Sequence, residues 1–115
     1  MRTLRELNLK ENEKKALHEL KRRLLKKFPD AEIILYGSKA RGDSDEESDI
    51  DVLVLLGREV NNTLEEEIFS ISFKIELNYD VIFGIIVYPQ KFWDSPLGKA
   101  MPLHWNVDKE GIPIA

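Results

Sequence analysis

The chain of 115 residues contains no cysteine, which rules out both a disulfide framework and a thiolate metal site. Its longest apolar run, residues 81–88, is far shorter than the roughly 20 residues that cross a bilayer as a helix. The N-terminus is polar from Arg2 onward and has no apolar signal-peptide core. These absences are typical of the reducing cytoplasm, so we expect a cytoplasmic location and no membrane partner.

The formal net charge of -4 conceals a strong asymmetry along the chain. Residues 1–27 hold ten Lys or Arg and four Asp or Glu, a charge of +6, whereas residues 28–115 hold seven and seventeen, a charge of -10. The basic segment is either a solvated helix face or a docking surface for an acidic protein or an RNA. The hydrophobic fraction of 43% is sufficient for one packed core, so we expect a single domain over residues 1–115.

Hydrophobic periodicity and turn residues predict an alternation of helices and strands. Helices are expected at residues 11–28, 38–41, 64–77 and 96–110, and strands at residues 32–36, 49–56 and 79–88. Thr63 is the expected N-cap of the third helix, and Pro102 must lie in the first turn of the last helix or break it. This order predicts an α/β (α+β) fold in which a small antiparallel or mixed sheet is flanked by helices.

A glycine-bounded turn, residues 37–42, follows the first expected strand and has the properties of a phosphate-binding turn. Gly37 lets the backbone approach a ligand closely because it has no Cβ atom. The amides from Ser38 onward can point at a phosphate, and the Ser38 hydroxyl can donate to a phosphate oxygen. Arg41 lies one helical turn later, where it can reach a phosphate or anchor the acidic loop that follows.

Two carboxylates, Asp49 and Asp51, stand one residue apart at the start of the second expected strand. Side chains two residues apart on a strand point to the same side, so these carboxylates project together and repel each other. A cation relieves this repulsion, and Mg²⁺ is the hard ion that one or two carboxylates hold together with substrate phosphates. Either motif alone is usually structural, but their order beside two apolar strands indicates a site for a nucleoside triphosphate and magnesium.

A third carboxylate, Asp80, precedes the apolar third strand. On a strand beside residues 49–56 it could face Asp49 and Asp51 and complete a site for two magnesium ions. In that position it would act as a general base or as a shared ligand of the ion that activates the attacking hydroxyl. An acid at the start of a strand is also common for structural reasons.

The segment GSKARGDSDEESDID resembles the signature of the DNA polymerase β-like nucleotidyltransferases, and most closely that of the minimal nucleotidyltransferase group. The resemblance implies a small α/β sheet flanked by helices. It also implies transfer of a nucleoside monophosphate, commonly AMP from Mg-ATP, to a hydroxyl group. Carried over by position, Gly37 and Ser38 would bind the triphosphate with Arg41 beside them. The minimal group is often encoded next to HEPN-domain toxins, which implies a toxin partner and an antitoxin role, with a toxin tyrosine as one acceptor.

The same resemblance assigns Asp49, Asp51 and Asp80 as metal ligands and catalytic residues, with two magnesium ions as cofactors and ATP as substrate. About 64 residues follow Asp51, enough to complete the sheet and its helices, so we expect the acceptor to come from a partner or a second subunit. Two alternatives stay open. The chain could neutralise a toxin by binding alone, or it could transfer nucleotides to RNA, for which the basic segment is the sole support.

Overall fold

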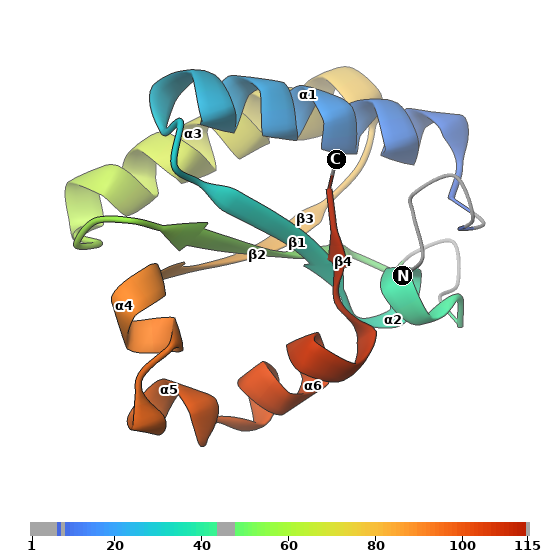
Figure 1. The fold of residues 1–115 in the computed structure, drawn as a ribbon. Helices are drawn as coiled ribbons and strands as arrows, with labels where there is room; N and C mark the ends of the chain where they lie inside the picture. The colour runs from blue at the N-terminus through green and yellow to red at the C-terminus, as the bar shows by residue number, and fades with distance from the viewer. Residues whose placement is uncertain (1–6, 8, 44–47, 115) are drawn as a thin grey trace.

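The computed structural model describes residue 7, residues 9–43 and residues 48–114, and its strands form one four-stranded mixed sheet (Figure 1). The strands are β1 (Glu32–Tyr36), β2 (Ile50–Leu56), β3 (Phe83–Pro89) and β4 (Ile112–Pro113). Their order in space is β3-β2-β1-β4; β1 runs antiparallel to both of its neighbours, whereas β2 and β3 are parallel. The expected small mixed sheet is therefore confirmed.

Helices cover both faces of this sheet (Figure 1). The long helices α1 (Glu11–Lys27) and α3 (Asn62–Tyr79) pack against each other on one face. The short helices α4 (Gln90–Trp93), α5 (Pro96–Lys99) and α6 (Pro102–Glu110) form the layer on the opposite face. A single turn of helix, α2 (Ser38–Arg41), continues from the end of β1. None of the described helices is long and apolar enough to span a membrane.

Strand β2 supplies both halves of the hydrophobic core because its side chains alternate between the two faces. Val52 and Val54 are fully buried under α1 and α3, in a cluster that also contains the α1 leucines 17, 20 and 24. Leu53 and Leu55 lie on the other face, in a smaller cluster with Trp93 of α4 and Val107 of α6. A strand buried on both faces reads as a nearly continuous apolar run, as residues 52–56 do.

Two expected boundaries around the third helix are wrong. Asn61, not Thr63, is the N-cap of α3, and its side-chain oxygen accepts a hydrogen bond from the Leu64 amide at 2.9 Å. At the other end α3 continues to Tyr79, and Asp80 ends it in a left-handed conformation with φ of 55°. The third strand consequently begins at residue 83 rather than at residue 79.

The expected final helix is broken into two pieces. Helix α5 ends at Lys99, and Pro102 starts α6 as its first residue, a position where the missing amide hydrogen of proline costs nothing. Gly111 ends α6 as expected. The short elements α4 and β4 have no strong pattern in the sequence and were not predicted. Within the acidic loop, residues 44–47 lie outside the described residues.

A buried ion pair attaches α2 to α1. Lys39, in α2, and Glu13, in α1, are 5% and 6% exposed, and the Lys39 ammonium lies 2.6 Å from Glu13 Oε2. Glu13 Oε1 also accepts a hydrogen bond from the Lys10 amide at 2.9 Å. The pair connects the turn that follows β1 to α1, because a buried ammonium group is stabilised by a carboxylate at this distance.

We predict that Glu13→Gln lowers the free energy of unfolding by about 3 kcal/mol, because it removes the carboxylate charge that lies 2.6 Å from the buried Lys39 ammonium. Urea unfolding measures the loss. The matched control is Glu67→Gln, which removes the exposed pair between Lys27 and Glu67 and should cost less than about 1 kcal/mol. Equal losses in the two variants would show that the buried pair does not hold α2 in place.

Candidate active site

The candidate site is centred on Asp51, which lies in the middle of the sheet. Asp51 pairs with Tyr36 of β1 on one side and with Gly84 of β3 on the other. Residues directly opposite each other on paired strands point to the same face of the sheet, so this row faces the layer formed by α4–α6. The Asp51 carboxylate therefore reaches the surface at the point where the core of that face ends.

Two glycines make room for the Asp51 carboxylate. A Cβ atom on Gly37 would lie 2.3 Å from Asp51 Oδ2, and a Cβ atom on Gly84 would lie 2.9 Å from Asp51 Oδ1. Both separations are shorter than real Cβ contacts allow, so any other residue at either position would displace the carboxylate. Gly37 also has φ of 79°, which favours glycine. Gly84 was not singled out in the sequence, although a glycine inside an apolar strand often marks such a close approach.

The electrostatic environment of Asp51 is suited to a cation. Burial raises the pKa of Asp51, and the negative charges of Asp49 and Glu110 raise it further, while Arg41 opposes them. Asp49 is exposed and stands immediately before β2 rather than within it. Desolvated and crowded carboxylates of this kind fit a hard divalent ion, which would be held by Asp49 and Asp51 together with substrate oxygens and water. No group of three or more acidic, His or Cys side chains arranged to hold a metal occurs among the described residues.

The turn after β1, residues 37–41, which we call the phosphate turn, lies beside these carboxylates. The Arg41 amide donates to the Gly37 carbonyl at 3.0 Å, and Gly42 ends the turn of helix in a left-handed conformation. Arg41 donates from Nε to Asp43 at 3.0 Å, so it contacts the acidic loop, which is one of the two alternatives that the sequence left open for it. Gly37 and Arg41 lie near Asp51, and Ser38 directly follows Gly37, while their role in binding phosphate stays a prediction.

Two further residues of this site were missed in the sequence. Glu110, at the end of α6, accepts a hydrogen bond from the Gly37 amide at 3.1 Å and pairs with Arg41. Tyr36 faces Asp51 across the strand pair, and burial, with help from the charges of Asp51 and Glu110, raises the pKa of Tyr36 to about 12. The tyrosine is therefore a neutral hydroxyl at physiological pH. Nothing in the sequence near Glu110 indicates this contact, because 73 residues separate it from Gly37.

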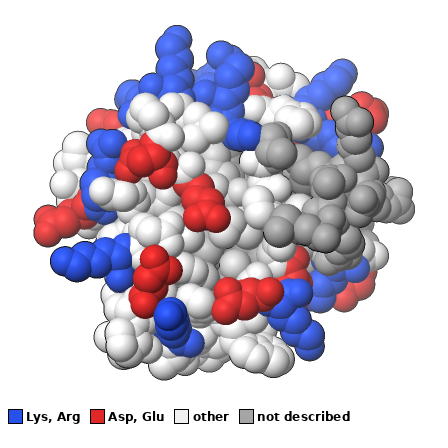
Figure 2. Space-filling view, viewed as in Figure 1, with Lys and Arg blue, Asp and Glu red and all other residues white. Residues whose placement is uncertain are grey.

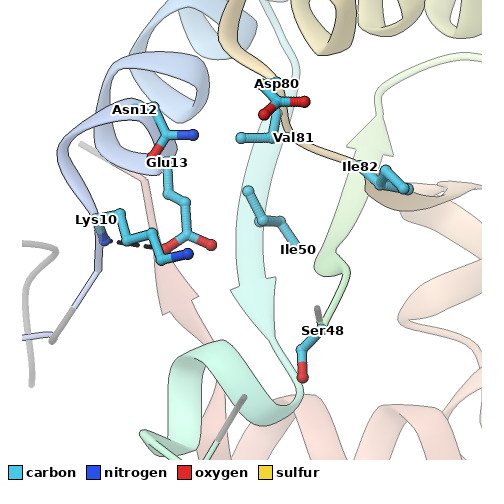
Figure 3. A pocket seen from close by; sticks show the side chains of 8 residues that line it. All are labelled: Lys10, Asn12, Glu13, Ser48, Ile50, Asp80, Val81 and Ile82. Carbon is cyan, nitrogen blue, oxygen red and sulfur yellow. Dashed lines mark hydrogen bonds between the residues drawn. The ribbon is translucent and has the colours of Figure 1, made fainter. Parts of the chain in front are cut away.

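Asp80 lies elsewhere. It lines a cavity of about 440 Å³ that is bordered by residues of α1 and by Ile50, whose side chain belongs to the core under α1 and α3. Figure 3 shows Asp80 and Asn12 at one end of this cavity and Ser48 at the other. The Asn12 amide donates to the Tyr79 carbonyl at 2.9 Å and so fixes the end of α3. Asp80 is thus not part of the row that carries Asp51, and its role as a metal ligand stays a prediction.

With this geometry in view, the chain can be compared with known proteins. The profile of a family described as a nucleotidyltransferase domain matches residues 17–101. Two proteins of Methanocaldococcus jannaschii, both named as candidate protein adenylyltransferases, are similar in sequence. MJ0604 is 34% identical over 102 residues, which make up 87% of this chain and 95% of that protein. MJ0141 is 43% identical over 56 residues, 49% of this chain but little more than half, 57%, of that protein.

A solved structure described as a toxin–antitoxin with AMP-PNP has a similar fold. Its TM-score is 0.59 at 21% identity, and the match covers 87% of this chain and 70% of that chain. The chain belongs to the nucleotidyltransferase domain family, and by class it is a nucleotidyltransferase. The resemblance drawn from GSKARGDSDEESDID is thereby confirmed.

We predict that Gly84→Ala weakens Mg²⁺ binding about 10-fold, because the added methyl group forces the Asp51 carboxylate from its place. Isothermal titration of MgCl₂ measures the change. Gly42→Ala is the matched control: Gly42 has φ of 85°, but a Cβ atom there would meet nothing within 4 Å. It should lower stability by about 1 kcal/mol and leave Mg²⁺ binding unchanged. Unchanged binding in Gly84→Ala would contradict the proposed placement of Asp51.

We further predict that Asp51→Asn stabilises the protein in the absence of metal, because it removes a partly desolvated negative charge that Asp49 and Glu110 repel. The pKa of Asp51 is raised in the folded state, so its ionised form costs stability at pH values above that pKa and the cost disappears as the pH falls through it. Thermal unfolding in EDTA at pH 7 tests this. Added MgCl₂ should raise the melting temperature of the wild type but not that of Asp51→Asn.

Thermal unfolding with and without MgCl₂ also tests the third carboxylate, in the variant Asp80→Asn. Asp80 lies with Asn12 and Ile50 rather than with Asp51, so this variant should keep the magnesium-dependent rise in melting temperature. Loss of that rise would restore Asp80 to the ligand set.

Proposed function

We propose that the chain transfers AMP from Mg-ATP to a hydroxyl group on a partner macromolecule. The observation that carries this proposal is the row formed by Tyr36, Asp51 and Gly84 with the phosphate turn at its end. A phosphate-sized turn beside desolvated carboxylates is suited to a triphosphate and its metal ion. Membership of the nucleotidyltransferase family and similarity to two proteins named as candidate protein adenylyltransferases support the choice of reaction.

Each residue of the site has a defined role in this reaction. The Ser38 hydroxyl and the backbone amides at the start of α2 would donate hydrogen bonds to the triphosphate, and Arg41 would neutralise part of its charge. Asp49 and Asp51 would hold magnesium, which when bound supplies charge stabilisation for an in-line displacement. The acceptor oxygen forms a bond to the α-phosphorus, the bond to the β-phosphate oxygen breaks, and pyrophosphate leaves while the acceptor proton passes to a nearby base or to water.

A toxin protein is the partner that we propose, with a HEPN-domain tyrosine as acceptor and neutralisation of the toxin as the outcome. The fold match to a toxin–antitoxin complex with AMP-PNP supports a partner of this kind. Asp49 is exposed, which leaves the carboxylate side of the site accessible to a large acceptor. The two M. jannaschii relatives are named for transfer to protein, which favours a protein acceptor over RNA.

Neutralisation by binding alone is the second candidate, and one surface favours it. Phe69, Phe73 and Leu77 recur at four-residue steps along α3 and are 43%, 58% and 69% exposed. Large apolar side chains in a row are typical of a protein interface.

An RNA acceptor would use the Lys and Arg side chains along the upper rim, over α1 (Figure 2). Arg22 and Arg23 of α1 already pair with Glu19, which weakens the case for RNA.

The proposal predicts label transfer from α-labelled ATP to the toxin encoded by a neighbouring gene, in the presence of MgCl₂. Asp49→Asn and Asp51→Asn should each lower the rate about 100-fold or more, because each removes a metal ligand and with it several kcal/mol of transition-state stabilisation. Gel autoradiography measures the transfer. A toxin variant with its acceptor tyrosines replaced by Phe is the matched control and should stay unlabelled.

Toxin neutralisation in cells separates catalysis from binding. If Asp51→Asn binds the toxin with wild-type affinity but no longer neutralises it, catalysis is required. If it neutralises fully, binding alone is sufficient and the transferase proposal fails for this role.

A further inference from the structure

Glu110 is the most constrained acid of the site outside the expected ligands. Its side chain is 14% exposed, and its Oε1 atom accepts a hydrogen bond from the Gly37 amide at 3.1 Å. Arg41 Nη1 lies 3.3 Å from the same oxygen and 3.2 Å from Oε2. One carboxylate therefore contacts both ends of the phosphate turn, its first amide and its arginine.

The chain beyond α6 fixes Glu110 in this place. Ile112 of β4 pairs with Leu35 of β1, two residues before Gly37, so the end of α6 is held beside the start of the turn. Gly111 permits this approach, because a Cβ atom there would lie 2.5 Å from the Val107 carbonyl and 2.9 Å from an Ile34 methyl group. The pairing of β4 with β1 and the close approach at Gly111 therefore place the Glu110 carboxylate beside the turn without the help of a ligand.

The hydrogen-bond inventory of Arg41 leaves room for a phosphate. The guanidinium has five N–H donors, and the contacts to Asp43 and Glu110 use its Nε and Nη1 atoms. Within the described part of the chain no hydrogen bond from the Nη2 donors occurs, and the Arg41 side chain is 47% exposed. Glu110 therefore holds the guanidinium from one side without occupying the donors that a ligand would use.

Gly37 needs such support for a different reason. It has no side chain to pack, and glycine loses more conformational freedom on folding than any other residue. Its φ of 79° is a left-handed conformation that glycine adopts without strain. Hydrogen bonds of its own amide and carbonyl groups are what fix it: the amide donates to Glu110, and the carbonyl accepts from the Arg41 amide. Loss of the first bond would loosen the turn at the residue whose close approach to Asp51 shapes the site.

We propose that Glu110 is a positioning residue for the nucleotide: through the Gly37 amide and the Arg41 guanidinium it holds the phosphate turn in the arrangement that receives the phosphates. The proposal rests on the proposed function, since it assumes that the turn and Arg41 bind a triphosphate. Glu110 is not proposed as a metal ligand, because the described residues contain no set of three acidic side chains arranged for one. It acts through Gly37 and Arg41, as the outer partners of ligating groups do in many sites.

The test is calorimetric titration with AMP-PNP and MgCl₂, which needs no acceptor. Glu110→Ala removes both contacts and should weaken binding about 10-fold. Glu110→Gln keeps a side-chain oxygen that can accept from the Gly37 amide but loses the charge, so its affinity should lie between those of the wild type and Glu110→Ala. Asp43→Ala removes the other, exposed partner of Arg41 and should change the affinity less than about two-fold.

A double-variant cycle decides whether Glu110 acts through Arg41. In the Arg41→Ala background, Glu110→Ala should weaken binding by clearly less than 10-fold, because part of its effect depends on the arginine. Equal effects in both backgrounds, unchanged affinity in Glu110→Ala, or tighter binding in it would each overturn the proposal. Tighter binding would mean that the carboxylate competes with phosphate. If the wild type binds no AMP-PNP, the proposed function itself fails, an outcome distinct from all of these.

Discussion

A charged side chain in the centre strand of the sheet is the constraint on which the rest of this structure depends. Asp51 stands between Tyr36 and Gly84 in a strand whose next five residues are buried. Asp51 is the second residue of β2, so its carboxylate lies at the edge of the hydrophobic layer, where it can remain partly exposed to solvent. Gly37 and Gly84 provide the space that it needs, and both would be unfavourable choices at these positions if the sheet served only to build a core.

One face of the sheet carries most of the hydrophobic core, and the other face carries the candidate site. Helices α1 and α3 supply the larger core, and the ion pair between Glu13 and Lys39 attaches the phosphate turn to that rigid half. The opposite face carries fewer buried side chains, under α4–α6, and it is the face to which Asp51 points. Glu110 connects this second layer to the same turn. The turn is thus held from both faces, although it consists of a single helical turn with little packing of its own.

The local features of the fold could be predicted from the sequence, and the features that depend on distant contacts could not. Residues 32–36 and 38–41 were placed correctly because turn residues bound them and their apolar pattern is strong. The sequence also assigned the phosphate turn and Asp51 to one site from their order along the chain, and the antiparallel pairing of β1 with β2 brings them side by side. Asp80 was placed on a strand because an apolar run follows it, but α3 extends further than its polar and β-branched residues indicate.

The missed residues share one physical cause. Gly84 matters only because of the register between β3 and β2, and Glu110 only because β4 returns the chain to β1. Neither the parallel register nor a two-residue strand has a periodic signal that a single sequence can reveal. The glycine itself is a different kind of signal, because a glycine weakens the interior of a strand and often marks a place where another group approaches closely.

The balance of charge around the phosphate turn supports the proposal that magnesium and a triphosphate bind there together. Asp49, Asp51 and Glu110 bring three negative charges, whereas Arg41 brings one positive charge that Glu110 and Asp43 already share. A free triphosphate would add to this excess of negative charge, whereas a magnesium ion held by the carboxylates reduces it and offers coordination positions, filled by water, that phosphate oxygens can take. Bound magnesium would therefore remove the electrostatic obstacle to the triphosphate. The folded protein, with its repelling carboxylates, is then poised to gain stability from that complex.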